Sequence, residues 1–536
     1  MAFADSCVRA YRNFALPFLT LCLIVLVDNA AAEWLNHGGA LTNTRNAVVQ
    51  EVLINPISVR KLRLKWRFIA GFDISATPAV ASGVVYFPSW NGFLYAVRAD
   101  NGALIWKQNL GTLTGLPPVG AIVNVTVSRS TPTVAGDLLI CGVYGPAVVV
   151  AVRRLTGELV WLTRLDPRPL AQITASGTFY SGAYYVGVSS LEELLPAQQC
   201  CTFRGSMVKL DARTGTILWQ TYTIPDNCGK LGGYSGAAIW GSSPAIDILR
   251  GLVYVGTGNL YIAPAEVLAC QRALNNQTTP PINVSQCIGP DVHFDSIVAF
   301  DINSGQIKWS RRLSGYDVFN FECLVPNNPN CPPGPNLDAD FGEAPMLLTI
   351  NNNGRKRDIA VAVQKSGFAW ALDRDNGDIV WSIRAGPGSN QGGGIWGAAT
   401  DGKRVYTNIA NGDRLPFTLA PSTRTTTAGG WVALDANTGQ ILWSTANPSN
   451  EISPGPVTIV NGVLFAGSTA PNGPFYAMDA NTGDIVWTYN TGATIYGGAS
   501  ASYGCVFIGN GYSVGLAKFH PTWTSGNSVF AFCASA

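Results

Sequence analysis

A short phrase recurs seven times along this chain and constrains its fold more than any other feature. The copies, clearest at residues 299–309, 433–443 and 477–487, end at Trp106, Trp161, Trp219, Trp309, Trp381, Trp443 and Trp487. Each predicts a strand, a tight turn with Gly at a φ > 0 position, and a second strand that places Ile and Trp on one face. Successive Trp residues lie 44 to 90 positions apart. An all-β repeat of this length predicts a radial array of sheets, a β-propeller.

Two incomplete copies at the ends of the repeat predict one more blade. Residues 62–66, Leu-Arg-Leu-Lys-Trp, look like a second strand without its first. Residues 528–532, Ser-Val-Phe-Ala-Phe, look like a first strand without its second. Pairing the two would close the ring and leave no open sheet edge. The predicted fold is an all-β, eight-bladed propeller, with long insertions on one rim where functional sites are expected.

The composition suits a turn-rich β protein and argues against a nucleic-acid partner. Only 13% of the residues are charged, while 58 are Gly and 32 are Pro. The net charge is +2 and no basic run is present, so a nucleic-acid partner is not expected.

The first 32 residues are typical of a secretory signal peptide. Arg9 and Arg12 precede the apolar stretch 14–27, and Ala30-Ala31-Ala32 offers small residues for cleavage. A membrane anchor is the alternative, but the apolar run is shorter than the roughly 20 residues that cross a bilayer. We therefore expect a secreted chain, or a periplasmic one in a bacterium. Its mature domain, 33–536, would have no membrane span.

Twelve Cys residues agree with an oxidising compartment, and ten of them follow the predicted signal peptide. Proximity suggests that Cys270 pairs with Cys287 and Cys323 with Cys331, although sequence alone does not fix connectivity. In a eukaryotic secretory route, the chain would also offer three glycosylation sequons. These begin at Asn124, Asn276 and Asn283.

The residue types present exclude several kinds of active site. The chain has no Cys-x-x-Cys-His for covalent haem, no His-Glu-x-x-His and no P-loop. With only three His residues, a His-rich zinc or copper site is not expected. A Ca²⁺ or organic-cofactor site built from carboxylates, amides and aromatic rings stays open.

The repeated Ala-x-Asp-x-x-Thr-Gly-x-x-x-Trp phrase resembles the tryptophan-docking motif of quinoprotein alcohol dehydrogenases. These are eight-bladed propellers that use pyrroloquinoline quinone (PQQ) and Ca²⁺. Residues 34–39, 200–205 and 338–345 are similar to the polyvinyl-alcohol-dehydrogenase-like subgroup. The resemblance implies oxidation of a small, polymeric or sugar alcohol. Electrons would pass to a separate acceptor, because no haem motif is present.

The resemblance also implies which residues hold the metal and the quinone ring. Glu192 and Asn259 match the calcium ligands, and Ca²⁺ prefers carboxylate and amide oxygens. Trp240 approximates the Trp under the quinone ring, and Lys365 matches the cation beside its reactive carbonyl. Each position also has a structural alternative. Glu192 could be a solvated loop carboxylate, and Asn259 could end a strand. Trp240 could be a packed core ring, and Lys365 could be a solvated turn residue.

Further positions match partners of the cofactor's carboxylates. Arg129, Thr174 and Ser189 resemble the cation and hydroxyls of the family that bind them, and such groups suit a tricarboxylate. The adjacent Cys200 and Cys201 lie after Glu192, whereas the family's vicinal disulfide precedes the carboxylate-binding Arg. We expect Cys200–Cys201 to form a disulfide that could still reach the cofactor cavity.

The expected general base is the main departure from the family. The family has an Asp eleven residues after the Trp that corresponds to Trp309, where this chain has Asn320. An amide cannot accept a proton as a base, so nearby Asp317 is predicted as the catalytic base, with Asp340 or Glu343 as weaker substitutes. Asn320 also leaves an alternative function open: a non-catalytic propeller that binds a glycan or protein.

Overall fold

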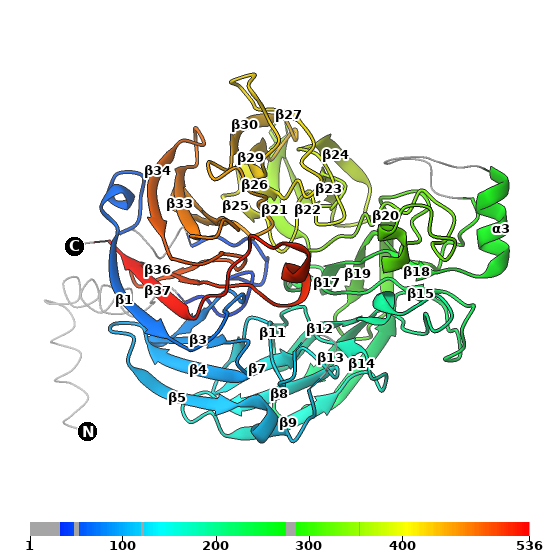
Figure 1. Ribbon diagram of the computed structural model, residues 1–536, viewed down its shortest axis with the longest axis horizontal. Coiled ribbons are helices and arrows are strands. Elements are labelled where there is room, and N and C mark those ends of the chain that lie inside the picture. The colour runs from blue at the N-terminus through cyan, green and yellow to red at the C-terminus, as the bar shows by residue number, and fades with distance from the viewer. Residues whose placement is uncertain (1–32, 48–52, 119–122, 275–285, 353, 535–536) are drawn as a thin grey trace, which may run out of the picture.

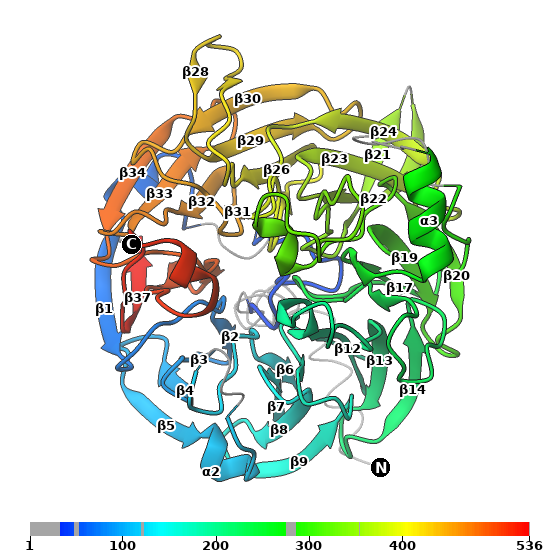
Figure 2. The same cartoon turned by 45° about the vertical axis from the view of Figure 1, so that its right-hand side comes forward.

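The computed structural model describes residues 33–47, 53–118, 123–274, 286–352 and 354–534. Eight antiparallel sheets surround a central axis (Figures 1 and 2), which confirms the predicted eight-bladed propeller. The eighth sheet has the order β1-β37-β36-β35, in which β1 (Arg63–Ile69) pairs with β37 (Ser528–Cys533). Strands from the two ends of the repeat therefore close the ring as predicted.

The blades follow one another in chain order, and each runs from its innermost strand outward. The first four are β2 (Ala79–Ala81), β3 (Val84–Pro88), β4 (Phe93–Arg98), β5 (Leu104–Asn109); β6 (Thr133–Ala135), β7 (Leu138–Val143), β8 (Val148–Arg153), β9 (Leu159–Arg164); β10 (Ala171–Gln172) and β11 (Thr178–Tyr180), β12 (Ala183–Ser190), β13 (Ser206–Asp211), β14 (Ile217–Tyr222); β16 (Ala245–Asp247), β17 (Leu252–Gly256), β19 (Ser296–Asp301), β20 (Ile307–Arg312). The last four are β21 (Met346–Asn352), β22 (Arg355–Val363), β23 (Phe368–Asp373), β24 (Ile379–Arg384); β25 (Ala399–Thr400), β26 (Arg404–Ile409), β29 (Gly430–Asp435), β30 (Ile441–Ala446); β31 (Thr458–Val460), β32 (Val463–Gly467), β33 (Pro474–Asp479), β34 (Ile485–Asn490); β35 (Ser500–Ser502), β36 (Cys505–Gly509), β37 and β1.

The insertions between strands carry the remaining elements. They are η1 (Ser58–Lys61), α2 (Leu110–Thr114), η2 (Glu192–Leu194), β15 (Ser235–Gly236), β18 (Leu260–Ile262), α3 (Ala265–Leu274), η3 (Phe321–Leu324), β27 (Phe417–Thr418), β28 (Thr425–Thr426) and η4 (Gly515–Phe519). Within the described residues, no helix has the length and apolar character needed to cross a membrane.

The repeated Trp residues join each blade to the next. Each lies in the outermost strand of its blade, and its indole N–H donates to a main-chain carbonyl of the following blade. The pairs are Trp66–Ala99, Trp106–Arg154, Trp161–Ala212, Trp219–Ile302, Trp309–Arg374, Trp381–Ala436, Trp443–Ala480 and Trp487–Leu62. The last pair joins the seventh blade to the closing blade, so the circle of contacts is complete.

The turn Gly of the repeat has a second role besides its positive φ. Gly483 has a φ of +77°, and a Cβ there would lie 2.5 Å from the Trp443 ring. Replacing Gly483 with Ala should lower the free energy of unfolding by about 1–3 kcal/mol through strain and overpacking.

Gly182→Ala is the matched control for Gly483→Ala. Gly182 has a φ of +79°, and no atom lies within 4 Å of the place that an added methyl group would occupy, so this variant measures backbone strain alone. Thermal unfolding should show a larger loss for Gly483→Ala. Equal losses would mean that the Trp contact contributes nothing.

The segment from Trp34 to Ala47 crosses the middle of the ring (Figure 2) and contacts all eight blades. It bonds successively to Val80, Val134, Thr178, Ile246, Leu347, Thr400, Ile459 and Ala499. Its His37 lines a small cavity together with Arg129, Thr174 and Trp396. Those three residues also line the main pocket described below, so this segment lies next to that pocket.

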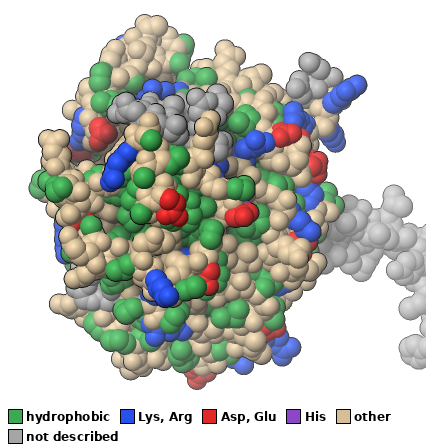
Figure 3. All heavy atoms as spheres, turned by 90° about the vertical axis from the view of Figure 1, so that its right-hand side faces the viewer, with side chains coloured by type: hydrophobic (Ala, Val, Ile, Leu, Met, Phe, Trp, Pro, Cys, Tyr) green, Lys and Arg blue, Asp and Glu red, His purple; other side chains and the backbone are tan. Residues whose placement is uncertain are grey.

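Four disulfides are present in the described part of the chain. Cys270–Cys287, Cys323–Cys331 and the vicinal Cys200–Cys201 confirm the predicted pairings. The fourth, Cys505–Cys533, was not predicted and links β36 to β37 in the closing blade. On the face seen in Figure 3, acidic and basic side chains are interspersed with hydrophobic ones. The predicted signal peptide and the sequons at Asn276 and Asn283 lie outside the described residues.

Candidate cofactor and metal site

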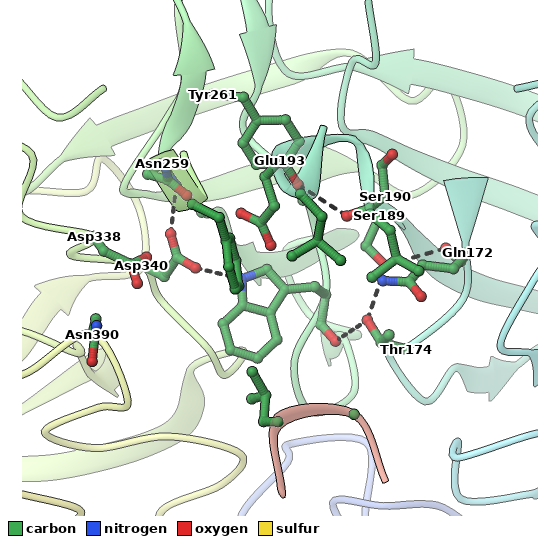
Figure 4. Close-up of a pocket in the computed structure, with 18 of the residues that line it drawn as sticks. Gln172, Thr174, Ser189, Ser190, Glu193, Asn259, Tyr261, Asp338, Asp340 and Asn390 are labelled. Carbon is green, nitrogen blue, oxygen red and sulfur yellow. Dashed lines mark hydrogen bonds between the residues drawn. The ribbon is translucent and has the colours of Figure 1, made fainter. Parts of the chain in front are cut away.

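A cavity of about 300 Å³ lies where the inner ends of six blades meet the insertions. The residues that line it and bear on its chemistry are Arg129, Thr174, Ser189, Glu193, Trp240, Asn259, Asp338, Asp340, Lys365 and Trp396. They come from loops far apart in the sequence, and only the closed ring brings them together. Figure 4 shows two groups of polar side chains on opposite sides of this pocket: Asn259, Asp338, Asp340 and Asn390 on one side, and Gln172, Thr174, Ser189 and Ser190 on the other.

The most densely charged part of the pocket is a buried lysine between two carboxylates. Lys365 Nζ lies 2.8 Å from Asp338 Oδ1 and 3.1 Å from Asp340 Oδ2. Burial alone would lower the pKa of Lys365, but the charges of Asp338 and Asp340 outweigh it and raise that pKa. Lys365 is therefore a fixed cation.

The amide of Asn259 is oriented by its two N–H groups. Its Nδ2 donates to the main-chain oxygens of Leu260 and Phe319, each at 2.9 Å. Because both donors are used in this way, the amide oxygen is left as the acceptor on a residue that lines the pocket. The neighbouring Gly258 allows the Asp340 carboxylate to approach the main chain, since a Cβ at Gly258 would lie 2.9 Å from Asp340 Oδ1.

Two Trp rings form an apolar base for the pocket. Trp240 and Trp396 meet edge to face, with ring centroids 4.9 Å apart. The Trp240 Nε1 donates to Asp340 Oδ2 at 3.0 Å, and Lys365 Nζ lies 5.2 Å from the Trp240 centroid. The Arg129 guanidinium lies 4.0 Å from the Trp396 centroid. No carboxylate forms an ion pair with Arg129 among the described residues, so it can bind an anionic ligand.

Two hydroxyl groups line another part of the pocket. Thr174 Oγ1 and Ser189 Oγ lie 2.9 Å apart, and Thr174 also donates to the main-chain oxygen of Trp240 at 2.8 Å. Both residues are buried. This arrangement ties the hydroxyl pair to the Trp240 backbone.

Burial raises the pKa of two acids that line the pocket. Burial, reinforced by the charge of Asp340, raises the pKa of Glu193 to about 8, although Lys365 opposes the rise. Burial also raises the pKa of Asp338 well above its usual value, despite the nearby Lys365. A carboxylate with a raised pKa is a stronger base than one in water.

Six of the predicted site residues lie together on the pocket wall. They are Arg129, Thr174, Ser189, Trp240, Asn259 and Lys365. The other four, Glu192, Cys200, Cys201 and Asp317, are not among the residues that line it.

Glu192 points to the main chain beside the pocket. Its Oε2 accepts N–H bonds from Thr202 and Phe203 at 2.6 and 2.8 Å. Cys200 and Cys201 belong to the hydrophobic cluster between blades, against which Trp240 packs. The Glu192 carboxylate is thus hydrogen-bonded to the loop that carries the disulfide. The next residue, Glu193, lines the pocket instead.

Asp317 lies behind the pocket wall and supports it. It is fully buried, and its carboxylate accepts N–H bonds from Asp338 and Ala339 at 3.1 and 2.7 Å. Burial raises its pKa, while these main-chain bonds oppose the rise. Asn320 does not line the pocket either, and its side chain caps η3 by accepting the Glu322 N–H.

The sequence reasoning missed Glu193 and Asp338 as wall residues. Glu193 is the neighbour of the residue chosen, and only the phase of η2 decides which of the two acids faces inward. Asp338 lies 29 residues after Trp309, not eleven, because the insertion with η3 and the Cys323–Cys331 disulfide precedes it. Asp338 belongs to the segment 338–345, which is similar to the subgroup. That similarity indicates the family but not the role of Asp338.

No group of three or more His, Cys, Asp and Glu side chains is close enough to hold a metal ion, within the residues that the structure describes. In the pocket, the Lys365 ammonium lies between Asp338 and Asp340. A cation site here would therefore combine Glu193 with the Asn259 amide oxygen.

Comparisons with known proteins agree with the fold and the repeat. A family model described as outer membrane protein assembly factor BamB matches residues 427–512, which include β29 to β36. A quinohemoprotein alcohol dehydrogenase from Comamonas testosteroni has the same fold, with a TM-score of 0.71 and 19% identity over 95% of this chain and 82% of that one.

Two curated relatives are similar over most of the chain. Polyvinylalcohol dehydrogenases from a Pseudomonas species and from Sphingopyxis sp. (strain 113P3) are 30% and 29% identical over 81% and 82% of this chain. The chain spans 64% of the length of each relative. These similarities, together with the docking-Trp propeller, show that the chain belongs to the quinoprotein alcohol dehydrogenase family, in its polyvinyl-alcohol-dehydrogenase-like subgroup.

Proposed function

We propose that this pocket binds PQQ and a divalent cation such as Ca²⁺, and that the protein oxidises an alcohol and passes the electrons to a separate acceptor. The observation that carries the proposal is the convergence of Asp338, Asp340, Lys365 and Asn259 over Trp240 in one buried cavity. The export signal predicted in residues 1–32 would place this reaction outside the cytoplasm.

The residues present fit both groups chemically. Asn259 and Glu193 offer the oxygen ligands that Ca²⁺ prefers. Arg129, Thr174 and Ser189 offer a cation and hydroxyls for carboxylates, and the Trp240 ring offers a flat apolar surface. PQQ, when bound, would supply an acceptor for the hydride of the alcohol, which carries both of the electrons removed.

The chain's own residues would orient and deprotonate the substrate. Asp338 would accept the hydroxyl proton at a carboxylate oxygen, because it lines the pocket and its carboxylate is held in an ion pair with Lys365. Lys365 would hold Asp338 and Asp340 in place through the two ion pairs and stabilise negative charge that develops beside it. Burial of this cluster keeps water away from the reacting groups.

The alternative of a non-catalytic propeller is less well supported. This alternative was considered because Asn320 replaces the Asp of the family. In the structure Asn320 caps η3, and carboxylic acids at other positions line the pocket. A glycan- or protein-binding site has no need for a buried lysine between two carboxylates.

A reconstitution assay tests the proposed function. Purified protein would be mixed with PQQ, Ca²⁺, an alcohol and an electron-accepting dye, with each component omitted in turn. We expect dye reduction only in the complete mixture. Reduction that does not require PQQ, or none with any alcohol, would contradict the proposal.

Cation affinity should rise with pH because Glu193 must lose its proton. With a pKa of about 8, Glu193 is largely protonated below that pH in the cation-free pocket, so a cation has to displace the proton. The Ca²⁺ association constant should rise by up to tenfold per unit between about pH 6 and 8, then level off. Calorimetry in two buffers would measure both affinity and proton release. Glu193→Gln should bind more weakly, with a shallower pH dependence; a flat profile for the unmodified protein would contradict the assignment.

A further inference from the structure

Three phenylalanine rings form a continuous wall that leads out of the pocket. Phe319 and Phe321 have ring centroids 6.3 Å apart, and Phe321 and Phe519 are separated by the same distance. All three line the cavity. Phe319 is only 5% exposed and Phe519 is 60% exposed, so the wall runs from the interior to the surface.

The inner end of the wall is attached to the proposed catalytic site. The main-chain oxygen of Phe319 accepts the Asn259 amide N–H at 2.9 Å, and the Phe319 N–H donates to the main-chain oxygen of Leu260 at 2.8 Å. The position of the first ring is thus fixed relative to a proposed cation ligand. A substrate whose hydroxyl group reaches Asp338 would have its carbon chain beside this ring.

The outer end is formed by three short helices from different blades. Leu194 of η2 and Leu516 of η4 also line the cavity, and they are 38% and 39% exposed. Phe321 begins η3, whose N-terminus is capped by Asn320 and whose following loop is closed by Cys323–Cys331. The mouth therefore presents mainly apolar side chains, with Lys518 of η4 as a charged residue that also lines the cavity, and it is held in place by hydrogen bonds and a disulfide.

Exposed apolar surface of this kind indicates binding of an apolar group. Each buried methylene contributes to affinity, whereas hydroxyl groups against three Phe rings would lose hydrogen bonds to water without replacement. We propose that this wall binds the hydrocarbon part of the alcohol, so that the site takes alcohols with an extended apolar chain and not sugars, and that Phe321 and Phe519 determine this specificity. The identity of the reacting group rests on the proposed function.

A binding series on the cofactor-free protein tests the wall independently of catalysis. Dissociation constants for propan-2-ol, pentan-2-ol, octan-2-ol and sorbitol would be measured by saturation-transfer NMR. We expect affinity to rise roughly threefold per methylene, and sorbitol not to bind. The double variant Phe321→Ala/Phe519→Ala should lose most of this rise, and Phe519→Ala, at an exposed position, should lose part of it.

Leu249→Ala is the matched control for Phe519→Ala. Leu249 is 92% exposed and lies in the turn between β16 and β17, away from the cavity lining, so the chain-length dependence should be unchanged. An affinity independent of chain length, equal binding of sorbitol, or an unchanged rise in the double variant would overturn the proposal.

The same variants separate this inference from the proposed function. If reconstitution with PQQ gives no activity but the binding series holds, the proposed function fails and the wall stands. If the enzyme is active, the double variant should raise KM for octan-2-ol with little change for propan-2-ol. Turnover that does not depend on chain length would contradict the proposed role of the Phe wall but not the proposed function.

Discussion

Replacing Asp338 with Asn should lower turnover of the reconstituted enzyme by about 10²–10⁴-fold, because an amide cannot accept the alcohol proton. Asp338 is buried next to Lys365, and Asn has nearly the same shape, so the fold and the pocket should be preserved. Dye-linked turnover at saturating alcohol would measure the loss, and circular dichroism would verify the fold.

Asp317→Asn is the informative comparison, because Asp317 was the base predicted from the sequence. Its carboxylate is occupied with the N–H groups of Asp338 and Ala339 behind the wall. We expect this variant to lose stability, and its turnover to fall at least tenfold less than that of Asp338→Asn. The reverse order would return the role of base to Asp317.

Replacing Lys365 with Met should lower the free energy of unfolding by about 3–5 kcal/mol at neutral pH, the usual cost of leaving a buried charge without its partner. Asp338 and Asp340 would then face each other without the ammonium that now lies between them. The pKa of Asp338 in the folded state, which Lys365 now lowers, should rise further. The deficit should therefore shrink as the pH falls towards about 4, where the unfolded carboxyls are also protonated.

The exposed pair Lys308–Asp301 provides the control for this effect. Its ammonium and carboxylate are 3.6 Å apart, and the Lys308 side chain is 47% exposed. Lys308→Met should change stability by less than about 1 kcal/mol, with little dependence on pH. Denaturant unfolding of both variants at several pH values would measure the difference. Similar losses for Lys365→Met and Lys308→Met would show that the buried cluster is not coupled as described.

The fold was predictable because its signal is local and repeated. A turn Gly and a Trp at fixed spacing determine both the hairpin and its contact with the next blade, as in Gly483 and Trp443. The incomplete copies at the two ends were enough to predict the closing blade. The disulfide Cys505–Cys533 was missed because its two cysteines are 28 residues apart and become neighbours only when β36 pairs with β37.

The site was only partly predictable because it depends on details that sequence spacing does not fix. Glu192 and Glu193 are consecutive, and the phase of one short helix decides which of them faces the cavity. The proposed base, Asp338, lies 29 residues after Trp309 instead of eleven, beyond the insertion that contains η3. By contrast, Arg129, Asn259 and Lys365 were identified from the resemblance to the family, and they lie near regular strands of the propeller.

A crystal structure of the protein grown with PQQ and Ca²⁺ would test the central claim most directly. We expect one planar ring against Trp240, with a carboxylate at Arg129 and a cation at Asn259 and Glu193. A pocket that stays empty under saturating PQQ and Ca²⁺, or a quinone bound elsewhere on the propeller, would contradict it.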